Sequence, residues 1–292
     1  MKNVFFLLIV GTGLIWAQSF ELIQNSLTIK SEAFQHEAGG STPEKIMAYL
    51  ADRSLDDVRA NLAHSQNGAP VSKQIIRFIP GKFRMDMTEK GEKLSYLMHY
   101  DGASARAYVV RWGARQYMTI DMNKMKQMQA RMKSALAGRS EQMKAMMKNL
   151  PPESRAQMEK MLGMRKESPP VVKKTGRDRN INGFHCVEYR IKEDNKLEQY
   201  WITEEKPFVR KAFEQLIRLF SALDRKKDLV MEQIPSGWPV VNKQVGQGFV
   251  TLSEITSVTQ KSFSETDFNP PAGFKEQNMD MLMNNPFGTT EQ

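Results

Sequence analysis

Methionine is the residue type that most suggests a binding function in this 292-residue chain. Ten of the twenty methionines lie between residues 122 and 164. Thioether sulfur suits Cu(I), and the flexible, polarisable side chain also packs against apolar surfaces of varied shape. Helical spacing places most of these residues in one stripe, which predicts an amphipathic helical segment over residues 122–164. The tentative ligand-binding residues on this stripe are Met125, Met132, Met143, Met146 and Met147.

Three readings of the stripe follow from its residues. Burial of one Met side chain contributes about 1.5–3 kcal/mol, so the stripe can serve as core filler without any ligand. It can equally contact an apolar ligand, or bind a soft metal through its sulfurs. A fourth reading comes from the flanking charges, because residues 123–167 contain eleven Lys and Arg but four Glu. Such a basic helix can dock on an anionic membrane surface or a partner.

Catalytic patterns are missing from the sequence. It has no His-Glu-x-x-His, no Gly-x-Ser-x-Gly and no Gly-rich phosphate loop. His185 and Cys186 are neighbours in a predicted strand, so their side chains point to opposite faces and form no dyad. Cys186 is the only cysteine, which excludes an internal disulfide and predicts a small buried side chain. We therefore expect a non-catalytic protein without a cofactor.

The first seventeen residues predict export. One Lys precedes an apolar run that is too short to span a membrane, and cleavage is expected after Ala17. No cysteine follows that run, so we expect no lipid anchor. The mature chain has no second apolar stretch of membrane-spanning length. These features predict a periplasmic or secreted protein. The net charge of +9 is by itself weak evidence for nucleic acid as a partner, and export argues against it.

The remaining chain has the pattern of one β-rich domain over residues 18–276. Alternating segments about ten residues apart predict an antiparallel meander. Thr42-Pro43 and the Ser54–Asp57 capping box predict a helical insertion at 41–66. A strongly amphipathic helix is expected at 207–223, a loop at 165–180 and a flexible tail at 277–292. Residues 73–88 predict two strands around the turn Pro80-Gly81. The other predicted strands are 19–34, 95–102, 106–112, 115–122, 181–194, 196–203, 228–234, 239–245 and 249–263.

Two groups of motifs resemble a known superfamily. The first is IIRFIPGKFRMDM with SYLMHYDGASARAYVVRWGARQYMTIDM, and the second is INGFHCVEYRI, QYWIT and FNPPAGFK. Together they resemble the LolA-like periplasmic lipoprotein carriers, and more closely a bacterial domain-of-unknown-function family, number 4412. The resemblance implies an α+β fold, in which a curved antiparallel half-barrel has helices over its concave face. It places Ile79 where the carriers have a lid-positioning Arg, and it matches Arg84 to an Arg of the unknown-function family.

The resemblance also directs the functional expectation. It suggests a binding protein for an apolar or lipid-like ligand, or for a lipidated partner in the cell envelope, and we expect this exported protein to be a monomer. Tyr108 and Trp112 join the tentative ligand-binding residues as apolar sheet positions facing the helices. The alternatives are a Met-rich copper-binding protein and a protein that docks on membranes or partners.

Overall fold

The fold was analysed in a computed structural model of the chain. It describes residues 19–62, 71–89, 91–101, 104–122, 124, 127, 169–193, 196–221, 234, 236–246 and 248–277, with the side chains of 216–221 excepted. The predicted signal peptide and the residues after 277 lie outside this part of the chain. So does the Met-rich segment beyond its first residues.

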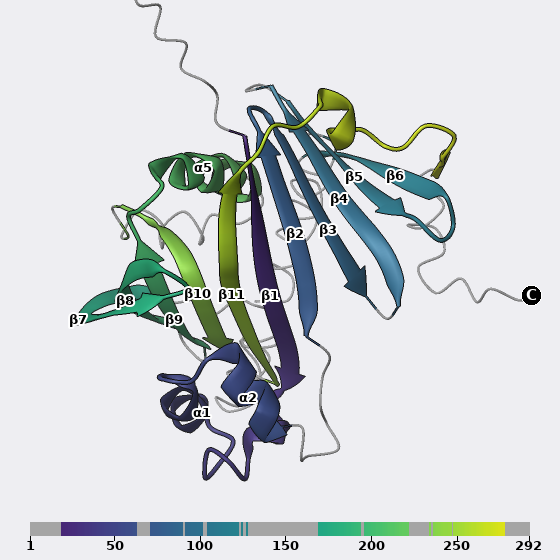
Figure 1. Cartoon of the computed structure of the whole chain (residues 1–292). Helices are drawn as coiled ribbons and strands as arrows, with labels where there is room; N and C mark the ends of the chain where they lie inside the picture. Colours follow the sequence, from purple (N-terminus) through teal and green to yellow (C-terminus); the bar gives the residue numbers. More distant parts are fainter. Residues whose placement is uncertain are drawn as a thin grey trace, which may run out of the picture.

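A single open, curled sheet dominates the molecule (Figure 1). Its order is β12-β6-β5-β4-β3-β2-β1-β11-β10-β9-β8-β7, so the N-terminal β1 joins two meanders at the centre. Neighbours are antiparallel except β12 and β6, which are parallel. This architecture confirms an α+β fold built on a curled antiparallel sheet. The strands are β1 Phe20–Lys30, β2 Ser72–Ile79, β3 Lys82–Glu89, β4 Glu92–Tyr100, β5 Ala105–Arg111, β6 Gln116–Asp121, β7 Val171–Ile181, β8 Phe184–Glu193, β9 Lys196–Thr203, β10 Trp238–Val245, β11 Phe249–Gln260 and β12 Lys275–Gln277.

Tight turns fix the register of the hairpins. Asn182 and Gly183 join β7 to β8 with φ of 51° and 83°, as a two-residue hairpin requires. Gly81, at φ 72° between β2 and β3, lies so near Tyr100 that an added Cβ would stand 2.7 Å from its carbonyl oxygen. The prediction of a loop at 165–180 is wrong for most of its length, because β7 begins at Val171. This edge strand is too polar to show the alternation of a half-buried strand.

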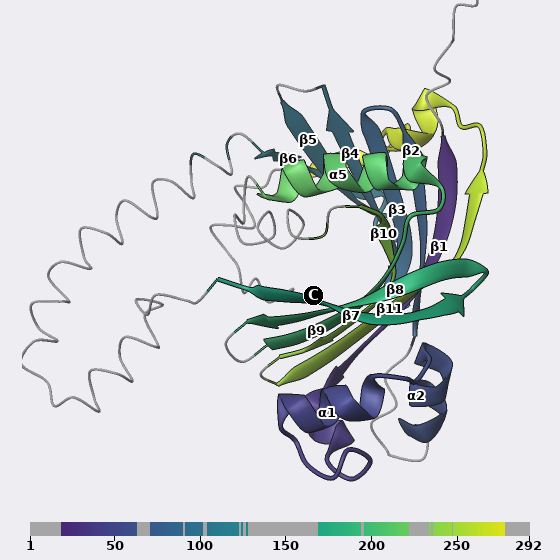
Figure 2. The same ribbon diagram turned by 90° about the vertical axis from the view of Figure 1, so that its left-hand side faces the viewer.

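In the described residues, three α-helices pack against the sheet. α1 (Pro43–Leu50) and α2 (Leu55–Leu62) lie between β1 and β2 in the chain and cover one end of the sheet. Apolar side chains of β1, β10 and β11 pack beneath them. α5 (Pro207–Ser221) lies within the curve of the sheet, near the opposite strand ends (Figure 2). Among the described helices, α1 and α2 therefore cover one end of the strands and α5 lies near the other end.

Lys243 fixes α1 to the sheet through a buried cation. Its side chain is 1% exposed, and its ammonium group donates to the carbonyl oxygens of Leu50, Ala51 and Arg53 at 2.6, 3.2 and 2.7 Å. These carbonyls lie at and just after the end of α1, where backbone acceptors have no partner within the helix. Two of them accept a second bond at 3.1 Å, Leu50 from the Arg53 N–H and Ala51 from the Gln199 amide. Burial, together with the charge of Arg179, lowers the pKa of Lys243 to about 8. The group serves helix attachment and is shielded from any ligand.

Candidate binding site on the inner face of the sheet

Cross-strand register defines an apolar inner face on β1–β6. Residues that pair directly across neighbouring strands point to the same side of a sheet. Two rows of such pairs run from β1 to β6, and α5 covers the β1 end of the first. The first row is Phe20, Phe78, Phe83, Met98, Ala107 and Ile120, and the second is Leu22, Ile76, Met85, Tyr96, Val109 and Met118.

The helix α5 packs onto this face through aromatic and small side chains. Phe208 meets Phe20 edge to face, with ring centroids 5.2 Å apart. Val209 and Ala212 are buried in the same core as Phe20. Arg210 holds the start of the helix by donating to the Gly237 carbonyl oxygen at 2.7 Å. The attachment of α5 is thus mainly apolar, with few polar bonds.

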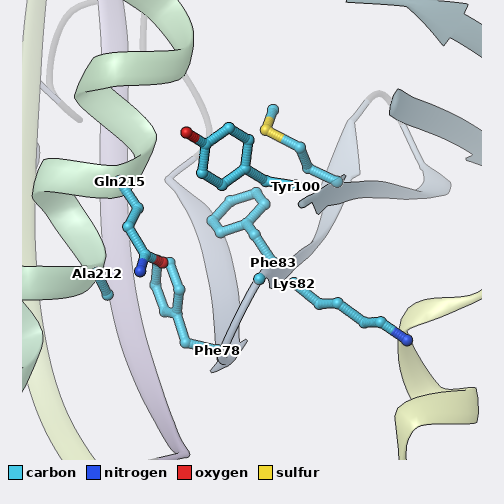
Figure 3. A pocket seen from close by; sticks show the side chains of 8 residues that line it. Phe78, Lys82, Phe83, Tyr100, Ala212 and Gln215 are labelled. Atoms are coloured by element: carbon cyan, nitrogen blue, oxygen red, sulfur yellow. The ribbon is translucent and has the colours of Figure 1, made fainter. Parts of the chain in front are cut away.

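A narrow crevice remains between α5 and the sheet. Figure 3 shows the rings of Phe78, Phe83 and Tyr100 on the sheet side, with Ala212 and Gln215 on the helix side. It encloses about 10 Å³, which is about the space of one water molecule. A larger apolar molecule can enter only if α5 or the side chains around the crevice move. The full lining is Phe78, Gly81, Lys82, Phe83, Met98, Tyr100, Ala212 and Gln215.

The inner face continues beyond the crevice as a partly exposed apolar surface. Met85, Tyr96, Val109 and Met118 are half-buried although none carries a charge. Met122, at the start of the Met-rich segment, is buried in one cluster with Met98 and Ala105. Because Met98 also lines the crevice, the Met-rich segment leaves the sheet beside the candidate site.

The sequence-predicted ligand residues of β5 and its turn are placed elsewhere. Tyr108 and Trp112 lie on the outer face, opposite α5, since Tyr108 pairs with Leu97 and Leu97 with Arg84. There the Trp112 ring packs edge to face on Phe274, with centroids 5.5 Å apart. The structure does not bring these two residues into the crevice. Met125, Met132, Met143, Met146 and Met147 lie outside the described residues.

An ion network occupies the outer face of β2–β4. The Asp86 carboxylate accepts from Arg77 at 2.6 Å, from Arg84 at 2.9 Å and from the Ser95 hydroxyl at 2.5 Å. Burial raises the pKa of Asp86, but the hydrogen bonds of Arg84 and Ser95 and the charges of Arg84 and Arg77 lower it below its usual value overall. The Trp112 indole donates to Ser95 at 2.7 Å. The polar groups of this network therefore find their hydrogen-bond partners among side chains of the same face.

Arg84 connects that network to residues 265–274, which are called the closing segment. Its guanidinium donates to the Asp267 carbonyl oxygen at 2.6 Å. His99 is hydrogen bonded to the carbonyl oxygen of Phe268 at 2.7 Å, and Phe268 is fully buried. Asp267 and Phe268 belong to the short 3-10 helix Glu265–Phe268. Arg84 thus holds the closing segment over the outer face, a role that its sequence motif did not reveal.

Cys186 and His185 lie on opposite faces of β8. Cys186 is buried, and burial raises the pKa of its thiol to about 12. The adjacent His185 is exposed, consistent with opposite faces of β8. In the part of the chain that the structure describes, no three His, Cys, Asp or Glu residues cluster as metal ligands do. No helix within that part is long and apolar enough to cross a membrane.

Comparisons with known proteins show a family match over part of the chain. The profile of the family described as "Domain of unknown function (DUF4412)" matches residues 139–274, which include β7–β11 and α5. The match covers the second group of sequence motifs and leaves the β2–β6 motifs outside. Among solved structures, two crystal forms of PNGF-II resemble the chain, with TM-scores of 0.35 and 0.36 and identities of 10% and 8%. Each alignment covers 92% of this chain but 32% and 33% of PNGF-II, so the chain spans about a third of that protein. No curated protein matches the sequence.

Proposed function

We propose that the protein is an exported, non-catalytic binding protein that takes an apolar or lipid-like ligand on the inner face of its sheet. One observation carries the proposal. The two apolar rows of β1–β6 are closed by α5 at one end and half-exposed at the other, around Met85, Tyr96, Val109 and Met118. The sequence resemblance to LolA-like lipoprotein carriers supports the same assignment.

The energetics favour an apolar occupant. Removing apolar surface from water contributes about 25 cal/mol per Å², so a ligand that covers the half-exposed rows gains free energy. The crevice of about 10 Å³ is too small for such a ligand at rest. Binding is therefore coupled to a shift of α5, whose mainly apolar contacts can slide without breaking an ion network. The Met side chains beside it adapt to the shape of the ligand.

The test uses an uncharged fluorescent naphthylamine probe and two variants that add the same charge to opposite faces. Met118→Glu places a carboxylate on the inner face, and Thr88→Glu places one at an exposed position of β3 on the outer face. We expect the wild type to bind the probe, Met118→Glu to weaken binding at least tenfold, and Thr88→Glu to leave it unchanged. Absence of probe binding to the wild type, or equal losses in both variants, would contradict the proposal.

The copper-binding and membrane-docking alternatives depend on the Met-rich and basic residues 123–167. These stay predictions, because the side chains that carry them lie outside the described residues. No observation in the described residues favours either over the inner-face site.

A further inference from the structure

A second, larger cavity lies near the β7 edge of the sheet. It encloses about 280 Å³, just below the range of about 300–1,000 Å³ that is usual for small-molecule sites. It shares no residue with the crevice beside α5. Strands β7–β9, the turn before α5 and Ser236 build it together. The lining residues are Lys174, His185, Val187, Tyr189, Ile202, Glu204, Glu205 and Ser236.

The floor of the cavity is apolar. Val187 of β8 pairs directly with Ile202 of β9, so both side chains point to one side. Tyr189 follows two residues after Val187 and therefore shares that side. Tyr189 and Ile202 are buried and belong to one apolar cluster with Ile234. This floor can hold the hydrocarbon part of a small molecule.

The rim of the cavity carries charges of both signs. The Lys174 ammonium lies 6.0 Å from the centroid of the Tyr189 ring. Glu204 accepts from the hydroxyl of Ser236, and Glu205 accepts from the backbone N–H of His185 at 2.8 Å. Both carboxylates thus have neutral donors as partners. Within the described residues no Lys or Arg forms an ion pair with either of them.

We propose that this cavity binds a small organic zwitterion, in which an ammonium and a carboxylate or phosphate are a few atoms apart. The ammonium would meet Glu204 and Glu205, and the anionic group would meet Lys174. The apolar part would cover Val187, Tyr189 and Ile202. A ligand with one charge satisfies only one side of the rim and leaves the opposite charge without a partner, which is unfavourable in a partly enclosed site.

Calorimetric titration of the full chain tests this inference with defined probes. L-leucine and O-phosphoethanolamine supply the two possible anionic groups. Isoamylamine and 4-methylpentanoate are analogues of leucine that carry one charge each. We expect at least one zwitterion to bind, and each single-charge analogue to bind at least tenfold more weakly than leucine if leucine binds. A preference for phosphoethanolamine would identify the anionic group as phosphate.

Variants assign the binding to this cavity. Lys174→Gln and Glu204→Gln change exposed residues, so the fold should be kept, and thermal unfolding verifies it. Each substitution should lower the affinity for the zwitterion at least tenfold. Lys173→Gln is the matched control, because Lys173 is the exposed neighbour on the opposite side of β7. Failure of both zwitterions to bind at millimolar concentration, tight binding of a single-charge analogue, or equal losses in the Lys173 and Lys174 variants would overturn the inference.

Discussion

The inner and outer faces of β2–β5 differ in how far other residues of the chain bond to and cover their side chains. On the outer face, Asp86 is bonded to Arg77, Arg84 and Ser95, and the closing segment packs over Trp112. On the inner face, the row beside α5 is largely buried, whereas the row that includes Met85, Tyr96 and Val109 is only partly covered. Within the described residues, the chain therefore completes one face with its own side chains and leaves part of the other as an apolar surface. This difference is the reason for assigning ligand binding to the inner face.

Phe78→Ala should give the largest change in stability. Phe78 is 5% exposed, and its ring lies 4.8 Å from Phe20 and 5.2 Å from Phe83, measured between centroids. Loss of a buried Phe side chain costs about 3–5 kcal/mol, from lost transfer free energy and the cavity left behind. Urea unfolding measures the effect. Phe249→Ala, at a residue that is 56% exposed, is the control and should change the free energy of unfolding by less than about 1 kcal/mol.

A loss below about 1 kcal/mol for Phe78→Ala would show that the contact between α5 and the sheet is looser than described. The closed state of the crevice would then be one of several arrangements.

Asp86→Asn should give a smaller, pH-dependent change. The folded-state pKa of Asp86 is lowered, so its carboxylate stabilises the protein above the usual Asp value of 3.8, and that stabilisation is lost as pH falls through the folded pKa. We expect the variant to be less stable by about 1.5–3 kcal/mol at pH 7, as is typical for hydrogen bonds to charged groups. Unfolding measured from pH 7 to pH 3 should show this difference shrinking below about pH 4. A constant difference would mean that Asp86 acts through packing alone.

Met118→Ala should have the smallest effect on stability while still affecting ligand binding. Met118 is half-buried on the inner face, so its truncation should cost no more than about 1 kcal/mol. Affinity for the naphthylamine probe should nevertheless fall, because the ligand loses an apolar contact. Parallel unfolding and fluorescence titrations measure the two effects. A variant with reduced stability and unchanged probe affinity would assign Met118 to the core.

The sequence predicted well the features that depend on neighbouring residues. Thr42 accepts a hydrogen bond from the Lys45 backbone at the start of α1, and Ser54 and Asp57 form reciprocal bonds at the start of α2. The amphipathic pattern of α5 and the strand spacing of the meander are equally local. Each of these signals lies within a few residues, where backbone geometry alone decides which groups meet.

Only the tertiary structure decided which side chains of each strand point to the inner face and which to the outer face. In β5, Val109 and Val110 are both apolar, and alternation cannot tell which of them faces α5. Tyr108 was predicted to face the helices, yet the register of β3–β5 turns it outward. The strand β7 escaped prediction because its polar residues gain their partners from β8 and from the turn between α1 and α2, as in the ion pair of Arg177 with Asp52.

The cavity at β7–β9 shows the same limit most clearly. Lys174, Glu204 and Ser236 are separated by 30 or more residues in the chain, and no spacing in the sequence connects them. They meet because Lys174 lies on β7, Glu204 directly follows β9 and Ser236 lies just before β10, and these strands belong to one side of the same sheet. Residue type and local pattern determined the elements of this protein. Long-range pairing and sheet curvature determined its sites, because those depend on which distant side chains the curled sheet brings together.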